Sequence, residues 1–334
     1  MKKLKMGVLG VSAHFISRVL PPVQKSELVE IYAIASRSPD KAKNASEKHD
    51  IPAYYQSYED LLRDKSIDMV YIPLPNHMHA EWINRSADAG KHIICEKPVA
   101  MNAKEAEEAV LYTADRNVKL MEAFMYKFHP QWVMAKSLIA GGSIGNIQTI
   151  HTFFGYYNND AANIRNIKEY GGGAILDIGC YASSSARFLF NTEPRRVMAL
   201  NSYDNKFGTD YLSSGILDFG ETRSVFTVST QTFHSQKVEI HGSAGVLEIE
   251  IPFNPIPDVP MKLTLATDNG IRSIETEPAD HYRLQFDSFA KALINNTEVP
   301  IPLSDAVANM RVLDGLFASG KSGSWVELYP LSQK

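Results

Sequence analysis

The first third of the chain alternates short apolar segments with helix-like segments, and this alternation constrains the fold more than any other feature. Alternation of this kind is typical of βαβ units, in which helices cross over between parallel strands. Strands are expected at Gly7–Leu9, Val29–Ala35, Asp68–Ile72, His92–Glu96 and Lys119–Ala123. The pattern therefore predicts an α/β fold whose first domain, residues 1–123, is a Rossmann-like parallel sheet.

Prolines and capping residues mark the helix boundaries of this region. Pro21 and Pro22 are expected to end or kink the helix Ile16–Gln24 near its C-terminus. Ser38 precedes a proline and an aspartate, which suits the start of the next helix. Asn102, with a glutamate three residues later, resembles a capping box. These signals separate the strands by single helices, as the βαβ pattern requires.

Beyond this region, strand-like segments follow one another with short turns between them, which indicates a largely antiparallel sheet. The expected strands are Gly145–Phe154, Arg196–Tyr203, Tyr211–Phe219, Arg223–Thr232, Lys237–His241, Val246–Ile251 and Met261–Thr267. Helical patterns at Gly173–Phe190, Tyr282–Asn295 and Leu303–Ser319 are expected to cover one face of this sheet. Residues 124–334 are therefore predicted to form a C-terminal α+β domain built on a large, mostly antiparallel open sheet.

The other face of that sheet predicts self-association. The segment 224–230 places β-branched and aromatic residues on both of its faces, while helices are available for one face only. A large uncovered apolar face is an association surface. The chain is therefore expected to form a homodimer or a homotetramer.

Composition excludes several classes of function. The 34 basic and 38 acidic residues give a net charge of −4, so no basic excess attracts nucleic acid. No window reaches the ~20 apolar residues of a membrane span, and the N-terminus lacks the pattern of a signal peptide. Cys95 and Cys180 allow one disulfide, but two reduced thiols are expected. A cytoplasmic protein is predicted.

The ends of the first two strands indicate a dinucleotide site. Gly10 and Ser12 stand where a full phosphate loop would have its first two glycines, although an ordinary strand-to-helix turn explains them equally well. Ser36 and Arg37 follow the second strand, where NAD-binding proteins usually carry Asp or Glu. Arg37 can pair with a 2′-phosphate or can simply be a solvated surface arginine. NADP is therefore favoured as cofactor, and NAD stays possible.

Three segments carry a resemblance to a known family: Tyr71–His79, Ala89–Pro98 and Gly171–Tyr181. In this order and spacing they resemble the glucose–fructose oxidoreductase / inositol dehydrogenase (Gfo/Idh/MocA) family, over nearly the whole chain. Tyr181, where many members have His, and the run Met121–Pro130 resemble the branch of dihydrodiol, xylose and keto-sugar dehydrogenases and reductases. The resemblance implies an NAD(P)-dependent oxidoreductase that acts on a small polyhydroxylated substrate.

The resemblance also implies a role for each matching residue. The implied cofactor contacts are Gly10, Ser12, Ser36, Arg37, Pro75, Asn76, His79, Glu96 and Lys97, and the implied substrate-pocket and catalytic residues are Lys97, Asp177 and Tyr181. It further implies that the Lys97–Pro98 bond is cis. Substrate specificity is expected to depend on loops such as Asn158–Tyr170.

The chemistry of these residues agrees with that implication. Hydride transfer at an alcohol carbon needs a group that moves the hydroxyl proton. A tyrosine phenol starts near pKa ~10, and a nearby ammonium favours its phenolate form. Tyr181 and Lys97 can form such a pair, and Asp177 can orient the substrate or Lys97 if the segment is helical. Each alone is more often a core tyrosine, a solvated lysine or a helix cap.

Other candidates are weaker. His77 and His79 form a His-x-His pair without a third ligand at metal-site spacing, so no metal site is predicted. His129 is either a substrate contact or a structural histidine. A non-catalytic NAD(P)-sensing regulatory protein on the same fold is the alternative function, which the presence of both Lys97 and Tyr181 disfavours.

Overall fold

The computed structural model describes residues 2–328, which form two compact units. Unit 1 comprises residues up to 125 together with residues 280–307, and unit 2 comprises residues 126–279 and those from 308 onward. The N-terminal part of unit 1 ends at residue 125, two residues beyond the predicted boundary at residue 123. Residues 280–307 belong to unit 1 as well, although they were predicted to lie in the second domain. The boundaries of independently folding domains stay a prediction.

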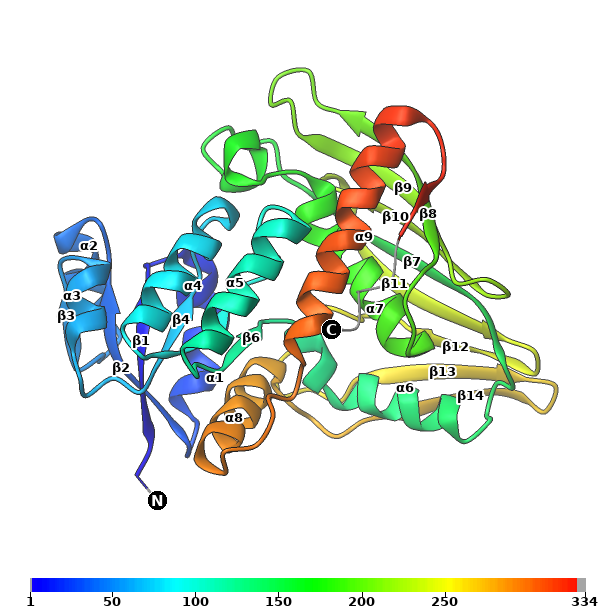
Figure 1. The fold of residues 1–334 in the computed structure, drawn as a ribbon. Helices are drawn as coiled ribbons and strands as arrows, with labels where there is room; N and C mark the ends of the chain where they lie inside the picture. Colours follow the sequence, from blue (N-terminus) through cyan, green and yellow to red (C-terminus); the bar gives the residue numbers. More distant parts are fainter. Residues whose placement is uncertain (1, 329–334) are drawn as a thin grey trace. The chain divides into compact units, whose positions relative to one another are not determined.

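Unit 1 is built on a six-stranded parallel sheet, here called sheet A (Figure 1). Its strands are β1 (Leu4–Leu9), β2 (Val29–Ala35), β3 (Ala53–Tyr55), β4 (Met69–Ile72), β5 (His92–Cys95) and β6 (Leu120–Glu122). They lie in the order β3-β2-β1-β4-β5-β6, which is the doubly wound order of dinucleotide-binding sheets. All residues of β4 are buried, as expected when helices cover both faces. The predicted Rossmann-like sheet is confirmed.

The helices of unit 1 include one from the C-terminal part of the sequence. They are α1 (Leu20–Gln24), α2 (Pro39–Lys48), α3 (Tyr58–Arg63), α4 (His79–Asp88), α5 (Ala103–Asp115) and α8 (His281–Ile294). Helix α8 contacts α1 and β2, and its Phe286 ring lies 5.2 Å from the Tyr71 ring. The prediction that this helix covers the antiparallel sheet is therefore wrong. Its periodicity identified an apolar face but not the surface that the face packs against.

One local prediction at a helix boundary also needs correction. Pro21 and Pro22 lie in α1, which continues a π-helical turn at Phe15–Val19 and ends at Gln24, so the helix ends soon after the prolines as expected. Ser38 precedes α2 in an extended conformation, but its side chain makes no capping hydrogen bond. Asn102 does cap α5, because its side chain accepts a hydrogen bond of 2.9 Å from the Glu105 amide.

Unit 2 is built on a nine-stranded sheet, here called sheet B. Its strands are β7 (Ile147–Tyr157), β8 (Arg196–Tyr203), β9 (Asp210–Asp218), β10 (Arg223–Ser229), β11 (Gln231–Gly242), β12 (Gly245–Ile249), β13 (Lys262–Thr267), β14 (Gly270–Glu275) and β15 (Val326–Glu327). Their order is β14-β13-β12-β11-β7-β10-β9-β8-β15, and every ladder except β7–β10 is antiparallel. The predicted large, mostly antiparallel sheet is confirmed.

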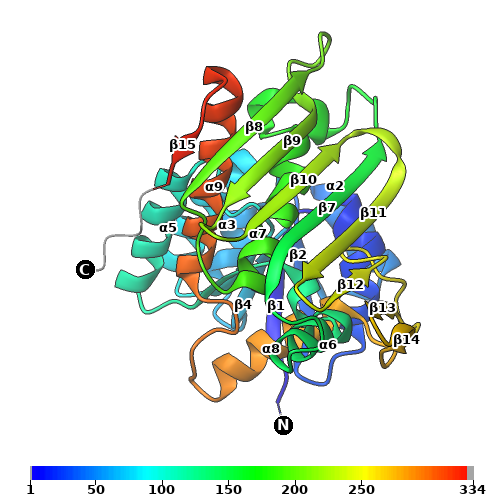
Figure 2. The ribbon, with the colours of Figure 1, turned by 90° about the vertical axis from the view of Figure 1, so that its right-hand side faces the viewer.

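Helices cover one face of the central strands of sheet B. Figure 2 shows α7 (Cys180–Phe190) and α9 (Leu303–Ser322) behind β8, β9, β10 and β7, with no helix in front of these strands. The alternation along β10 agrees, because Phe226 and Val228 are buried while Val225 and Thr227 are half-buried. A further helix, α6 (Pro130–Ala140), contacts β13. No helix among residues 2–328 is both long and apolar enough to cross a membrane.

Candidate functional site

The predicted cofactor residues of unit 1 gather at one edge of sheet A. Gly10 follows β1, Ser36 follows β2, Pro75 lies three residues beyond β4, and Glu96 follows β5. Because all strands of sheet A are parallel, these positions are all at carboxyl ends. Ligands of open α/β sheets bind outside the carboxyl ends of the strands, beside the point where strand order reverses. Here that point lies between β1 and β4.

Gly10 makes the turn that follows β1 possible. Its φ of +122° is one that other residues rarely adopt, and a Cβ there would lie 3.1 Å from the Leu74 side chain. Its amide donates a 2.9 Å hydrogen bond to the Ala35 carbonyl of β2, which fixes the turn against the neighbouring strand. The Ser12 hydroxyl accepts a 3.1 Å bond from the Phe15 amide and keeps its own proton free to donate. The turn thus places the glycine backbone, with no side chain over it, and the Ser12 hydroxyl at the carboxyl end of β1.

Arg37 places a positive charge at the end of β2. Its side chain is exposed, whereas Ser36 is buried and accepts a 3.2 Å hydrogen bond from the Ser38 amide. Burial raises the pKa of the Tyr58 phenol, and the charge of the adjacent Arg37 acts in the opposite direction. The Tyr58 hydroxyl in turn lies 3.8 Å from where a Cβ on Gly10 would be. The glycine turn and the guanidinium therefore share one neighbourhood, as a dinucleotide with a 2′-phosphate requires.

His79 connects two loops at this edge. The ring is fully buried, with Nδ1 2.7 Å from the Pro98 carbonyl and Nε2 2.8 Å from the Leu74 carbonyl. Burial lowers the pKa of the His79 imidazole, while the two carbonyls favour its protonated form. The side chain therefore joins the segment after β4 to the segment after β5. The cofactor contact implied for His79 stays a prediction.

Glu96 is held in place by a buried tyrosine. The Tyr71 hydroxyl donates a 2.6 Å hydrogen bond to Glu96 Oε1, and His14 Nε2 lies 3.8 Å from the same oxygen. Burial raises the pKa of the Tyr71 phenol well above its ordinary value, and the Glu96 charge adds to this, so Tyr71 remains a donor. The next peptide bond, Lys97–Pro98, is cis as predicted. The Lys97 side chain is half-buried at the end of β5.

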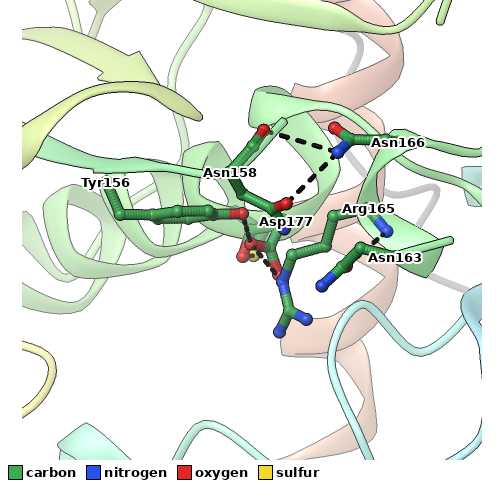
Figure 3. A network of polar contacts seen from close by, with 7 residues as sticks. Tyr156, Asn158, Asn163, Arg165, Asn166 and Asp177 are labelled. Atoms are coloured by element: carbon green, nitrogen blue, oxygen red, sulfur yellow. Dashed lines mark hydrogen bonds and ion pairs between the residues drawn. The ribbon is translucent and has the colours of Figure 1, made fainter. Parts of the chain in front are cut away.

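In unit 2, Asp177 lies in a polar network that the sequence did not indicate (Figure 3). Its Oδ2 accepts a 2.5 Å hydrogen bond from the Tyr156 hydroxyl and a 2.9 Å bond from Arg165 Nε. The Asp177 side chain is 12% exposed and that of Arg165 is 37% exposed. Asp177 raises the pKa of the Arg165 guanidinium, and burial together with the Asp177 charge raises the pKa of Tyr156. Asp177 is therefore an ion-paired carboxylate, and Tyr156 stays protonated.

The loop that carries Arg165 is ordered by its own asparagines. The Asn163 side chain accepts a 3.1 Å hydrogen bond from the Arg165 amide and caps a 3₁₀ turn at Ile164–Asn166. Asn166 Nδ2 donates to the Asp160 carbonyl at 2.8 Å and approaches Asn158 Oδ1 at 3.3 Å. Figure 3 shows the Arg165 guanidinium with its terminal nitrogens turned away from Asp177. The loop Asn158–Tyr170, expected to govern specificity, thus presents a fixed cationic group.

The glycine run before the segment that carries Asp177 and Tyr181 is required by close packing. A Cβ on Gly172 would collide with the Arg165 carbonyl, and one on Gly173, whose φ is +119°, would collide with Asp210. The Ile175 amide donates a 2.7 Å hydrogen bond to Asp210 Oδ2, so this buried carboxyl caps the π-helical turn Ile175–Gly179. Burial raises the pKa of Asp210 to about 7. Asp210 is thus a structural carboxyl beneath the segment that carries Asp177.

Asp210 predicts a pH dependence of stability. Its carboxyl ionises near pKa ~4 when unfolded but near pKa about 7 when folded. The stability that Asp210 contributes is therefore complete below about pH 4 and is lost as the pH rises through about 7. The difference in unfolding free energy between wild type and Asp210→Asn should fall over this range by on the order of a few kcal/mol. Urea unfolding at several pH values measures it, and a constant difference would contradict the prediction.

Tyr181 lies in an aromatic cluster of unit 2. It is 5% exposed, and its ring centroid lies 5.1 Å from Phe253, 5.8 Å from Phe154 and 5.9 Å from Tyr126. Tyr126 is anchored in turn by a 2.8 Å hydrogen bond between its hydroxyl and Ser184 Oγ. Tyr181 lies two residues after the π-helical turn, and such turns are frequent at functional sites. Asp177 is the main cause of the raised pKa of Arg165, and the charge of a Tyr181 phenolate in the same unit would add to it.

The remaining predicted residues have mainly structural surroundings. His129 is fully buried, precedes α6, and accepts a 3.2 Å hydrogen bond from the Gln131 amide. Burial lowers its pKa to about 4, which keeps the ring neutral. Both observations favour the structural alternative for His129. Cys95 and Cys180 are buried and form no disulfide with each other, as expected.

Two family models match the chain in succession. The model described as the oxidoreductase family with an NAD-binding Rossmann fold, GFO_IDH_MocA, matches residues 4–124. The model of the GFO/IDH/MocA C-terminal domain matches residues 132–248. The matches fall on the parts of the chain that carry sheet A and most of sheet B.

Individual proteins resemble the chain over most of its length. D-xylose 1-dehydrogenase (NADP(+)) 2 of Haloferax volcanii is 37% identical over 328 residues, covering 97% of this chain and 100% of that protein. Trans-1,2-dihydrobenzene-1,2-diol dehydrogenase of Xenopus tropicalis is 34% identical over 221 residues, covering 66% and 67%. The structure of KijD10, a 3-ketoreductase from Actinomadura kijaniata in complex with NADP and TDP-benzene, has a TM-score of 0.91 at 26% identity, covering 95% and 98%.

Proposed function

This chain belongs to the GFO/IDH/MocA family of NAD(P)-dependent oxidoreductases, and we propose that it uses NADP to interconvert an alcohol and a ketone on a small polyhydroxylated substrate. The proposed substrate class is a sugar, a cyclic polyol or a trans-dihydrodiol. The support is that the similar proteins include one named for a sugar and one named for a dihydrodiol. Arg37 carries the cofactor part of the proposal, since it places a cation beside the Gly10 turn. A nicotinamide supplies or accepts the hydride in such chemistry.

We propose that Tyr181 and Lys97 handle the substrate's hydroxyl proton. A tyrosine phenol can exchange that proton with the reacting oxygen, and a cation near it favours the phenolate. Lys97 is half-buried directly after β5, at the edge of sheet A where the cofactor residues lie. Asp177 is proposed to act as a positioning residue, because its carboxylate is already bonded to Arg165 and Tyr156.

The test is a substrate screen that also compares the two cofactors. Aldoses, inositols and trans-dihydrodiols are offered with NADP and with NAD, and the absorbance of the reduced nicotinamide is followed. Turnover with a member of these classes is expected. Tight NADP binding without turnover of any of them would instead support the NAD(P)-sensing regulator.

Arg37→Asp is expected to abolish the preference for NADP. The substitution removes a cation and puts a like charge near the position proposed for the 2′-phosphate. The Kd for NADP should rise by ~100-fold or more, since a lost charge-assisted bond and a new repulsion each contribute on the order of 1.4 kcal/mol or more. The Kd for NAD should stay the same or fall. Wild-type protein that binds NAD more tightly than NADP would contradict this assignment of Arg37.

We also propose that two copies pair through the open face of sheet B. Leu200 of β8 is 75% exposed and Tyr157 of β7 is 64% exposed, and Figure 2 shows no helix in front of these strands. Leu200→Glu, combined with Leu212→Glu on β9, is expected to convert the wild-type dimer or tetramer into smaller species by light scattering. Leu111→Glu on α5, which is 59% exposed in unit 1, is the matched control and should change nothing. A monomeric wild type at micromolar concentration would contradict the pairing.

A further inference from the structure

Three potential metal ligands meet on the open face of sheet B. They are His151 on β7 and Glu239 and His241 on β11, and their ligand atoms all lie within 4.8 Å of one another. His151 is exposed, and the other two are half-buried. The imidazole rings of the two histidines have centroids 5.0 Å apart. The sequence did not predict this cluster, because about ninety residues separate His151 from Glu239 and His241.

The backbone holds these side chains in fixed register. Strands β7 and β11 are antiparallel neighbours in the middle of sheet B, with His151 opposite Glu239 and His241 opposite Thr149. Glu239 and His241 are two residues apart on one strand, so their side chains point to the same face. His151 lies directly across from Glu239 on the neighbouring strand and diagonally across from His241. The backbone hydrogen bonds between β7 and β11 therefore hold these three side chains close together without a bound metal ion.

One atom of the cluster lacks a partner. Nε2 of His241 is shielded from solvent and has no hydrogen-bond partner among the described residues. A buried polar atom without a partner is rare in folded proteins and is often explained by an ion or a water. Two imidazoles and one carboxylate are a ligand set suited to zinc and similar borderline cations, which bind such nitrogens at about 2.0–2.1 Å.

The neighbouring lysine does not block the site. Lys237 lies 3.1 Å from Glu239 Oε1 but 2.8 Å from Glu248 Oε2. Glu239 can therefore turn toward a cation while Lys237 keeps its shorter ion pair. Lys237 is a competitor whose removal should strengthen binding.

We propose that His151, Glu239 and His241 bind one divalent transition-metal cation of the zinc type on the open face of sheet B. Three protein ligands leave a further coordination position for water or another ligand. The cation would link β7 to β11 on the face opposite α7 and α9. This site lies apart from the network of Tyr156, Arg165 and Asp177 and does not depend on the proposed catalytic function.

The test is calorimetric titration of the full-length, chelator-treated protein with zinc chloride, with cobalt(II) absorption as a second measurement. One cation per chain is expected. His151→Ala and His241→Ala should each weaken binding by at least ~10-fold, which is about 1.4 kcal/mol. His234→Ala is the matched control, because His234 is an exposed histidine on the same strand that is not part of the cluster.

Two further outcomes decide the proposal. Lys237→Leu should bind zinc more tightly than wild type, because it removes a competing cation and adds no ligand. Cobalt(II) should give the visible absorption of a low-coordinate site in wild type and lose it in His241→Ala. The proposal is overturned if wild type binds no more tightly than His241→Ala, or if His234→Ala weakens binding as much as the cluster variants do. Circular dichroism on each variant separates loss of a ligand from loss of the fold.

Discussion

Tyr181→Phe and Lys97→Ala should each lower kcat by about two orders of magnitude or more, the usual contribution of a positioned acid–base group. The phenylalanine keeps the ring that packs against Phe253, Phe154 and Tyr126, so the aromatic cluster should persist without the hydroxyl. NADP binding should change little in either variant, because neither side chain lies among the residues at the ends of β1 and β2. Steady-state kinetics and fluorescence titration of NADP measure the two effects separately.

The double variant should be little slower than either single variant. Residues that act on one proton contribute as a unit, and removing the second after the first costs little more. Multiplicative losses would mean that Lys97 and Tyr181 serve different steps. Tyr126→Phe is the matched control, since it removes a tyrosine hydroxyl from the same cluster, one that is bonded to Ser184. Near-wild-type turnover in Tyr181→Phe would remove this tyrosine from the mechanism.

The sequence predicted most of the fold because the fold follows from short-range patterns. Runs such as Val29–Ala35 and Arg196–Tyr203 have exactly the residue bounds of β2 and β8. Strand-like segments that follow one another with short turns between them predicted that sheet B is mostly antiparallel. The parallel ladder between β7 and β10 could not be anticipated in this way, because it pairs strands separated by β8 and β9 in the chain. The packing of α8 on α1 and β2 was missed for the same reason.

The candidate site was predictable where one residue type performs one role in a local motif. Gly10 has the positive φ that its turn needs, whereas the cis bond Lys97–Pro98 was implied only by the family resemblance. The partners of these residues were not predictable, since they come from elsewhere in the chain. Tyr58 beside Arg37, Tyr71 beneath Glu96 and Asp210 beneath the glycine run are examples. Such partners decide whether a polar group is free or engaged, and Asp177 is engaged by Tyr156 and Arg165.

Arg165→Met is expected to lower kcat by ~10–100-fold through two effects on its neighbours. Asp177 would keep the hydrogen bond from Tyr156 but lose the ion pair with Arg165, so a mostly buried carboxylate would lose a counter-charge. Breaking a buried ion pair costs ~3–5 kcal/mol, but Arg165 is 37% exposed, so a loss nearer 1–3 kcal/mol in unfolding free energy is expected. The second effect is the loss of a cation that interacts with the Tyr181 phenol.

The pH profile distinguishes this positioning role from a purely structural one. Without a nearby cation the phenolate is disfavoured, so the pH dependence of kcat should move to higher pH in Arg165→Met. Arg165→Lys keeps the positive charge but cannot reproduce the hydrogen bond that the planar guanidinium donates from Nε. This variant should therefore restore the pH dependence of kcat more fully than the value of kcat. In the double variant Arg165→Met with Asp177→Asn, no carboxylate is left unpaired, so stability should recover while kcat stays low. If stability and kcat recover together, Arg165 serves only to neutralise Asp177, and its proposed influence on Tyr181 is wrong.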